Sequence, residues 1–189
     1  MSYAQRRRFL WILLLIGVCL IAIVSQATTL IRLSFADLVR QASVIARVRC
    51  AASESVMVHG EIYTETRFDV LEPAKGDLPS QIVVRLPGGR FGHLHSRVDG
   101  APQFQPGEEL YLFLWNGGAG ETFSVLGWSQ GTFRIRRDAR TAEEKVAQDS
   151  AETPVFDPAT HAFTRTGVHN LRLEAFQEKL RQELFHSAR

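Results

Sequence analysis

The pattern of hydrophobic and polar positions changes character near residue 27. Before that point, apolar residues run without interruption from residue 9 to residue 24, a stretch of 16 residues. Three arginines at positions 6–8 precede this run, and the small residues Ser25 and Ala27 follow it. A basic start, an apolar middle and small residues at these two positions are typical of an export signal. We therefore predict a signal peptide that is cleaved between Ala27 and Thr28.

Two alternatives concerning this segment stay open. The apolar run is shorter than the roughly 20 residues of a typical spanning helix, but positive charges precede it, as the positive-inside rule requires. Residues 1–27 would then remain as an anchor, and the membrane would be contacted only through them. The order Gln5-Arg6-Arg7-Arg8-Phe9-Leu10 also resembles the twin-arginine export pattern, although the leucine-rich run favours the general secretory route. In each case we expect an exported protein, either periplasmic or secreted.

Beyond residue 27, alternating apolar and polar positions predict a series of short strands. Residues 62–70 show the pattern most clearly, because every second side chain there falls on one face. The predicted strands span residues 44–52, 62–70, 81–86, 110–115, 123–128 and 132–136. Segments rich in proline and glycine separate these strands. The segment between residues 87 and 107 is long enough to be functional or to carry structure of its own.

Helical signals flank the strands. Ser34, with Asp37 three residues later, predicts an acidic variant of a capping box at the start of a short helix. Near the C-terminus, apolar residues recur at steps of three and four and predict a helix over about residues 168–187, with Asn170 as its N-cap. The residues of this stripe are Leu173, Phe176, Leu180 and Leu184. We interpret the stripe as core. Between residues 137 and 166 we expect solvated excursions and a short hairpin.

These elements predict a mainly β fold. Six short strands in so short a chain bury their apolar faces better as a closed or nearly closed antiparallel barrel than as an open sheet. Residues 28–189 have the length of one domain, and such a chain is long enough to bury a core without disulfides. We therefore expect a single barrel domain with a helix at each end.

Charge and cysteine content argue against a nucleic-acid partner and against an intramolecular disulfide. Without the three arginines of the predicted signal, 19 basic side chains stand against 20 acidic ones, a net charge of −1. This charge gives no case for a nucleic-acid partner. Of the two cysteines, only Cys50 follows the predicted cleavage site, so no intramolecular disulfide is expected. We interpret Cys50 as a buried packing thiol.

Three segments occur in an informative order. Residues 42–48 form a predicted strand after the short helix, a long strand leads to Lys75-Gly76, and residues 107–114 open a returning strand. This order resembles the netrin-like and metalloproteinase-inhibitor domains, and it is similar to that of exported bacterial proteins without assigned activity. The resemblance covers about residues 34–135. It implies an OB-like Greek-key barrel of five to six antiparallel strands, and a protease as one candidate partner. In that family a cysteine at the mature N-terminus reaches the target's zinc, whereas Thr28 is expected here.

The segment between residues 87 and 107 is the predicted contact surface. Loops held by a rigid frame commonly carry binding residues, and this loop combines basic with apolar side chains, which suits a protein partner. The candidate contacts are Arg90, Phe91, Arg97 and Phe104. We therefore expect a non-enzymatic binding module, without a cofactor or metal, whose partner is a protein or an envelope component.

The alternative hypothesis is a small metal-binding protein or hydrolase. It would use His93 and His95, with His59 and Glu61 as further ligands, because imidazoles on one side of an extended segment can converge on zinc. No third ligand is fixed by spacing, so solvated histidines are the simpler interpretation. We do not interpret Ser129 as a nucleophile, because we do not recognise the glycine pattern of a nucleophile elbow around it.

Overall fold

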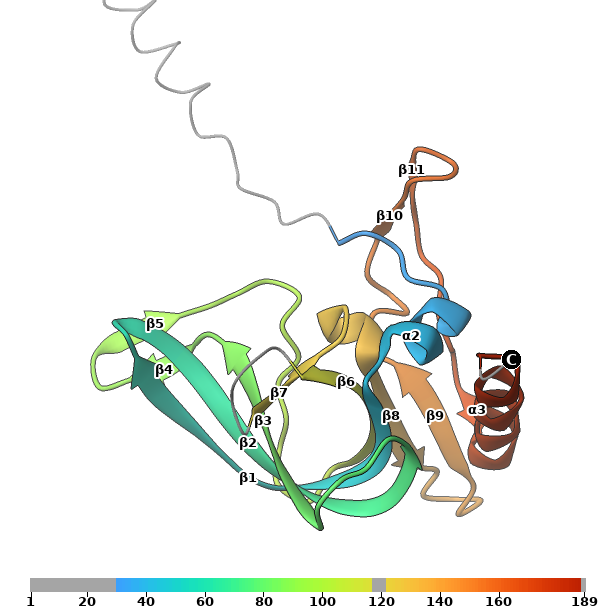
Figure 1. Ribbon diagram of the computed structural model, residues 1–189, viewed down its shortest axis with the longest axis horizontal. Coiled ribbons are helices and arrows are strands. Elements are labelled where there is room, and N and C mark those ends of the chain that lie inside the picture. Colours follow the sequence, from blue (N-terminus) through green and yellow to red (C-terminus); the bar gives the residue numbers. More distant parts are fainter. Residues whose placement is uncertain (1–29, 117–121, 188–189) are drawn as a thin grey trace, which may run out of the picture.

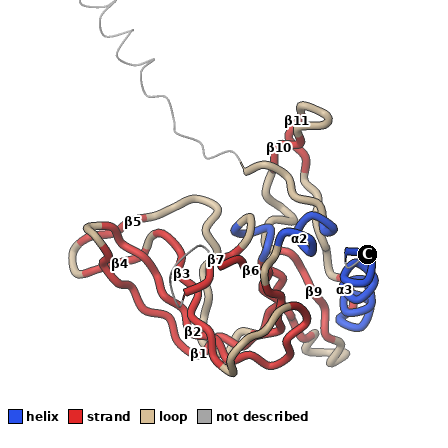
Figure 2. Tube along the Cα trace, in the orientation of Figure 1, coloured by secondary structure: helices blue, strands red, loops and turns tan. Residues whose placement is uncertain are grey.

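The computed structural model describes residues 30–116 and 122–187 of the chain (Figures 1 and 2). The predicted signal peptide and its cleavage site at Ala27 and Thr28 therefore lie outside the described residues. The helical elements are α2 (Phe35–Gln41), the 3-10 turn η1 (Trp128–Gly131) and α3 (Leu173–Ser187). The strands are β1 (Val44–Val58), β2 (Glu61–Lys75), β3 (Gln81–Pro87), β4 (Gly89–Phe91), β5 (Leu94–Ser96), β6 (Glu109–Asn116), β7 (Thr122–Val125), β8 (Thr132–Arg137), β9 (Glu144–Gln148), β10 (Val155–Asp157), β11 (Ala162–Thr164) and β12 (Leu171–Arg172). The prediction of a mainly β chain with a short helix near its beginning and a C-terminal helix is confirmed.

The central sheet closes on itself. Its strands follow the order β1-β2-β3-β7-β6, and β6 pairs with β1 again, which Figure 1 shows as a ring seen nearly end-on. Strands β8, β9 and β12 continue the sheet outward from β6. Strands β3 and β7 are parallel, with Val83 opposite Thr122 and Val84 opposite Phe123. The prediction of an all-antiparallel barrel is thus wrong for this pair, because strand directions cannot alternate all the way around a ring with an odd number of strands.

Strands β1 and β2 are much longer than predicted. Each spans 15 residues. The first part of β1, Ile45 to Arg49, pairs with both β2 and β6, whereas from Ala52 onward β1 pairs only with β2. Register shifts near Ile45, Arg47 and Cys50 bend the pair as it leaves the ring. The two strands therefore extend beyond β6 as an arm (Figure 1), along which β3 pairs with β2 as far as Tyr63. The β1 half of this arm, residues 52–58, is too polar to show alternation.

Two apolar cores lie on opposite faces of β6. Leu110, Leu112 and Leu114 belong to the core inside the ring, whereas Tyr111 and Phe113 belong to a second core between the sheet and the helices. A strand buried on both faces has a nearly continuous apolar sequence, which explains the run of residues 110–115. The interior core also receives Val48, Phe68, Val84 and Val125 from the other strands of the ring.

The second core joins the helices to the sheet. The Phe176 ring of α3 lies 5.2 Å from the Phe133 ring of β8, and Phe35 of α2 packs edge-on against both at 5.8 Å. Leu173 and Leu180 of α3 are also buried. Figure 2 shows the two helices gathered on one side of the ring. The interpretation of the C-terminal stripe as core is therefore confirmed for these residues.

The helix ends follow the predictions only in part. The Ser34 side chain accepts a hydrogen bond from the Asp37 amide at 3.1 Å, and the Asp37 carboxylate accepts from the Ser34 amide, so the predicted capping box is confirmed. Helix α3 instead begins at Leu173, directly after β12. Asn170 has a φ of +45°, in the left-handed region. The prediction that Asn170 is the N-cap is thus wrong, because β12 separates it from the helix.

The Lys75-Gly76 pair fastens β2 to the end of α2. The Lys75 ammonium donates hydrogen bonds to the carbonyl oxygens of Val39 and Ala42 at 2.7 and 2.6 Å, near the C-terminus of α2. These carbonyls have no partner within the helix, and the negative end of the helix dipole also favours a cation there. A Cβ atom at Gly76 would lie 2.6 Å from Cγ1 of Val44, so the close approach requires glycine. The motif that carries the family resemblance therefore has a structural function.

Candidate functional site

Residues 87–107 are not a structureless loop. Strands β4 and β5 form a hairpin in which Arg90 lies opposite His95 and Phe91 opposite Leu94. In Figure 1 this hairpin lies beside the outer part of the β1–β2 arm. Of the two alternatives for this segment, function or structure of its own, the second is thus observed. Its strands have three residues each, too few for alternation to reveal them from the sequence.

The base of the hairpin is fixed to the arm by hydrogen bonds. The Thr64 hydroxyl donates to the Gly88 carbonyl at 2.8 Å, the Gly88 amide donates to the Ile62 carbonyl at 2.8 Å, and the Arg90 amide donates to the Ser55 hydroxyl at 3.0 Å. Gly89 has a φ of +138°, and a Cβ atom there would lie 2.5 Å from Oγ of Ser55. Glycine thus allows the hairpin to approach the arm closely enough to form these bonds.

The far end of the segment is held by Arg134 of β8. Its guanidinium donates to the Asp149 carboxylate at 2.6 and 2.9 Å, to the Glu108 carboxylate at 2.6 Å and to the Gln103 carbonyl at 2.7 Å. It also lies 5.8 Å from the centre of the Phe104 ring. Burial alone would lower the pKa of Arg134, but the bonds to Asp149 and Glu108 more than offset this and raise it. The segment is therefore anchored at both ends, which is the frame that a binding surface needs.

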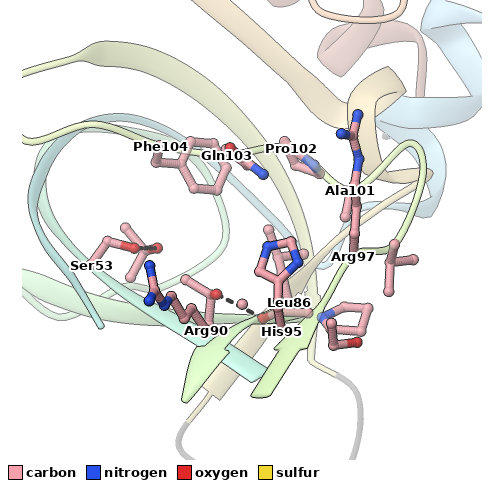
Figure 3. A pocket seen from close by; sticks show the side chains of 16 residues that line it. Ser53, Leu86, Arg90, His95, Arg97, Ala101, Pro102, Gln103 and Phe104 are labelled. Carbon is pink, nitrogen blue, oxygen red and sulfur yellow. Dashed lines mark hydrogen bonds between the residues drawn. The ribbon is translucent and has the colours of Figure 1, made fainter. Parts of the chain in front are cut away.

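A cavity of about 320 Å³ lies beneath the segment (Figure 3). Arg90, His95 and Arg97 contribute basic side chains, while Ser53, Thr64, Thr66 and Ser96 contribute hydroxyl groups. The apolar part of the wall consists of Leu86, Val98, Pro102 and Phe104, and Gln103 supplies an amide. None of the described residues lining the cavity carries a carboxylate. The cavity is therefore polar and basic, on an apolar wall.

Three of the four predicted contact residues are exposed and one is buried. Arg90, Phe91 and Arg97 are exposed, and Phe91 has 45% of its surface accessible. Phe104 is only 8% accessible, because its ring packs edge-on against Phe68 at 5.0 Å. Phe104 is thus a wall of the ring core and of the cavity, and it does not belong to the exposed surface of the segment.

Leu94, one of the apolar residues of the predicted contact loop, also belongs to the exposed surface. It is 57% accessible and lies opposite Phe91 on the hairpin. The two side chains share one face, because directly opposed residues of an antiparallel pair point the same way.

The histidines do not converge on a metal site. His93 lies in the turn between β4 and β5, and His95 lies on β5 facing the cavity. His59, with a φ of +50°, lies at the tip of the β1–β2 arm, where Glu61 accepts a hydrogen bond from the Tyr63 hydroxyl at 2.6 Å. Across residues 30–116 and 122–187, no three His, Cys, Asp or Glu side chains form a group that could hold a metal ion.

Ser129 lies between two glycines, Gly127 and Gly131, with the spacing of a nucleophile elbow. The prediction that this glycine pattern is missing is therefore wrong. The elbow, however, needs a strand followed by a helix, whereas here β7 leads through the 3-10 turn to β8. Gly127 and Trp128 both have positive φ, which also ends β7 earlier than predicted. The Ser129 hydroxyl is buried and has no hydrogen-bond partner among the described residues.

This turn positions the beginning of the described chain. The Gln130 side chain accepts a hydrogen bond from the Leu33 amide and donates one to the Ile31 carbonyl, both at 2.8 Å. Residues 127–131 thus have a structural function that accounts for their shape. Cys50 is also structural, since it is buried in the ring core, and this burial raises its pKa. Its interpretation as a packing thiol is confirmed.

Comparisons of the chain with protein-family models, with curated proteins and with solved structures find no match in any of the three. The resemblance to netrin-like domains therefore stays a prediction. Among residues 30–116 and 122–187, no helix combines the length and the apolar character that crossing a membrane requires.

Proposed function

We propose that this protein is an exported, non-enzymatic binding module that contacts a protein or an envelope component through residues 87–107. The observation that carries the proposal is the pair of exposed apolar side chains, Phe91 and Leu94, on a hairpin whose base is hydrogen-bonded to the β1–β2 arm. A surface fixed in this way loses little conformational entropy when it binds.

The composition of the hairpin fits a protein interface. Such interfaces have an apolar centre enriched in aromatic side chains and arginine, with a polar rim. Phe91 and Leu94 supply the centre, and Arg90 and Arg97 supply charge elsewhere on the same segment. Complete burial of a side chain of this size contributes about 1.5–3 kcal/mol. Two of them are enough to dominate a small contact surface.

We further propose that the ring is an OB-like barrel. The order β1-β2-β3-β7-β6 with closure onto β1 and a parallel β3–β7 pair supports this topology, if the β4–β5 hairpin is an insertion between β3 and β6. Barrels of this type bind ligands through the loops between their strands. The netrin-like resemblance adds a protease as one candidate partner. Export through residues 1–27 is part of the same proposal and rests on the sequence alone.

Capture from envelope extract tests the proposal with matched variants. A double variant, Phe91→Ser with Leu94→Ser, removes the apolar centre of the hairpin. Phe163→Ser is the control, because Phe163 is 63% accessible on a different hairpin, β10–β11. We expect a partner that is retained by the unaltered protein and by the control but lost with the double variant. Retention by all three proteins would place the contact elsewhere.

The metal-binding or hydrolase hypothesis has no structural observation in its favour, since His93 and His95 have no third ligand among the described residues. A zinc titration separates the two classes. Binding of zinc that disappears when both histidines are replaced by alanine, together with capture that survives the double variant, would favour that hypothesis over ours.

A further inference from the structure

The cavity beneath the β4–β5 hairpin is lined by basic side chains and, among the described residues, by no acidic one. The basic residues are Arg90, His95 and Arg97. Most other arginines that approach a β strand in this protein face a carboxylate, as Arg47 and Arg49 face Glu109 and Arg85 faces Glu65. The Arg90 guanidinium has no ion pair within the described residues. A guanidinium that lines a cavity without carboxylates can receive an anion from outside the protein.

The geometry directs Arg90 and His95 to the same space. They are directly opposite in the hairpin, so their side chains project from one face. Phe91 and Leu94, one position along each strand, project from the other face. Figure 3 shows the Arg90 and His95 side chains across the opening from Phe104 and Gln103. Arg97 differs from both, because its side chain is 78% accessible and lies 3.5 Å from the Asp99 carboxylate.

The floor of the cavity supplies further hydrogen-bonding groups. The hydroxyls of Ser53 and Thr66 bond to each other at 2.9 Å, and the Thr64 hydroxyl binds the Gly88 carbonyl. Each of these oxygens keeps a lone pair for a further donor. Leu86 and Phe104 form the apolar wall. A few polar groups converging on an apolar wall are typical of ligand sites, and the volume lies at the lower end of their range of about 300–1,000 Å³.

We propose that this cavity binds the carboxylate group of a small ligand or of a chain end, with Arg90 as its principal partner and His95 beside it. The planar guanidinium binds a carboxylate through two parallel hydrogen bonds, which favours this anion over a neutral group. The inference rests on the proposed function, because both use residues 87–107, and it adds the chemistry that the segment recognises. The hairpin thus presents an apolar outer face and an anion-binding inner face.

Calorimetric titration tests the proposal. The protein is used in the form that is isolated from the cell after export. The first pair of probes is glucuronate and its neutral counterpart glucose. The second pair is the dipeptide acid acetyl-leucyl-alanine and the neutral acetyl-leucyl-alanine amide. We expect at least one carboxylate to bind at millimolar concentration and both neutral probes to fail. Binding of glucuronate alone assigns a sugar acid, and binding of the peptide acid alone assigns a chain end. If neither acid binds, or if a neutral probe binds equally well, the proposal is wrong.

Variants make the test specific to Arg90. Arg90→Gln should weaken the carboxylate at least tenfold, which corresponds to about 1.4 kcal/mol. Arg67→Gln is the matched control and should change the affinity less than twofold, since Arg67 is exposed on β2 and does not line the cavity. Equal effects of the two variants would contradict the proposal. The Phe91→Ser and Leu94→Ser double variant should keep the carboxylate affinity, so this inference and the proposed function can fail independently.

Discussion

Replacing Phe68 by alanine should cost this protein about 3–5 kcal/mol of unfolding free energy. The Phe68 side chain is 0% accessible and lies inside the ring. Because water does not reach this side chain in the folded protein, truncation loses its full transfer free energy. The cavity left behind adds a further cost. Part of the cost is the edge-on contact with Phe104, at a centroid distance of 5.0 Å, and such pairs contribute about 0.5–1.5 kcal/mol beyond burial.

A double-mutant cycle measured by urea unfolding separates the cost of burial from the contact between the two rings. It compares the unaltered protein with Phe68→Ala, Phe104→Ala and the double variant. The coupling energy of the cycle should fall within the range for an aromatic pair. Phe91→Ala is the surface control and should stay within about 0.5 kcal/mol, since the Phe91 side chain is 45% accessible. A loss below this level for Phe68→Ala would place the side chain outside the ring. The register of β2 would then be displaced by one residue.

Three further predictions concern the ion contacts and the N-terminus. Lys75→Met should lower the unfolding free energy by about 2 kcal/mol, since charge-assisted hydrogen bonds contribute about 1.5–3 kcal/mol, and a urea curve with an unchanged slope should show it. Hydrogen bonds from Arg49 and then Arg47 lower the pKa of Glu109 below its ordinary value of 4.5. The stabilisation that ionised Glu109 contributes is therefore fully present above pH 4.5 and is lost as the pH falls through the lowered pKa. Glu109→Gln should flatten the plot of unfolding free energy against pH in this acid range. An unaltered plot would assign the acid dependence to other groups. The intact mass of the exported protein should correspond to a chain that begins at Thr28, whereas a membrane-embedded species that keeps residues 1–27 would support the anchor alternative.

The parts of the fold that could be predicted are those with a long local pattern. The alternation of residues 62–70 identified β2, and the apolar stripe of the last segment identified α3, because each repeats over several turns or pairs. The interpretation of Ser34 and Asp37 succeeded for the same reason, since a capping box involves only neighbouring residues. The parallel β3–β7 pair joins residues about 40 positions apart, and local periodicity carries no information on such pairing.

The candidate site was predictable in its location but not in its internal arrangement. Length and mixed composition were enough to single out residues 87–107. They did not show that Phe104 faces the core, since an aromatic residue in a loop has no alternating neighbours to define its face. The pairing of Arg90 with His95 was equally hidden, because it depends on a turn at residues 92 and 93 between strands of three residues. Ser53 reaches the cavity because β1 continues past its predicted end at residue 52.

The most direct test of the central claim is photo-cross-linking from the hairpin in the exporting cell. A photoreactive phenylalanine at position 91 replaces an exposed ring on the β4–β5 hairpin, and the same residue at position 163 replaces one on the β10–β11 hairpin. We predict a discrete adduct with an envelope protein or component from position 91 and none from position 163. An adduct from position 163 alone, or from neither position, would contradict the claim that residues 87–107 form the binding surface.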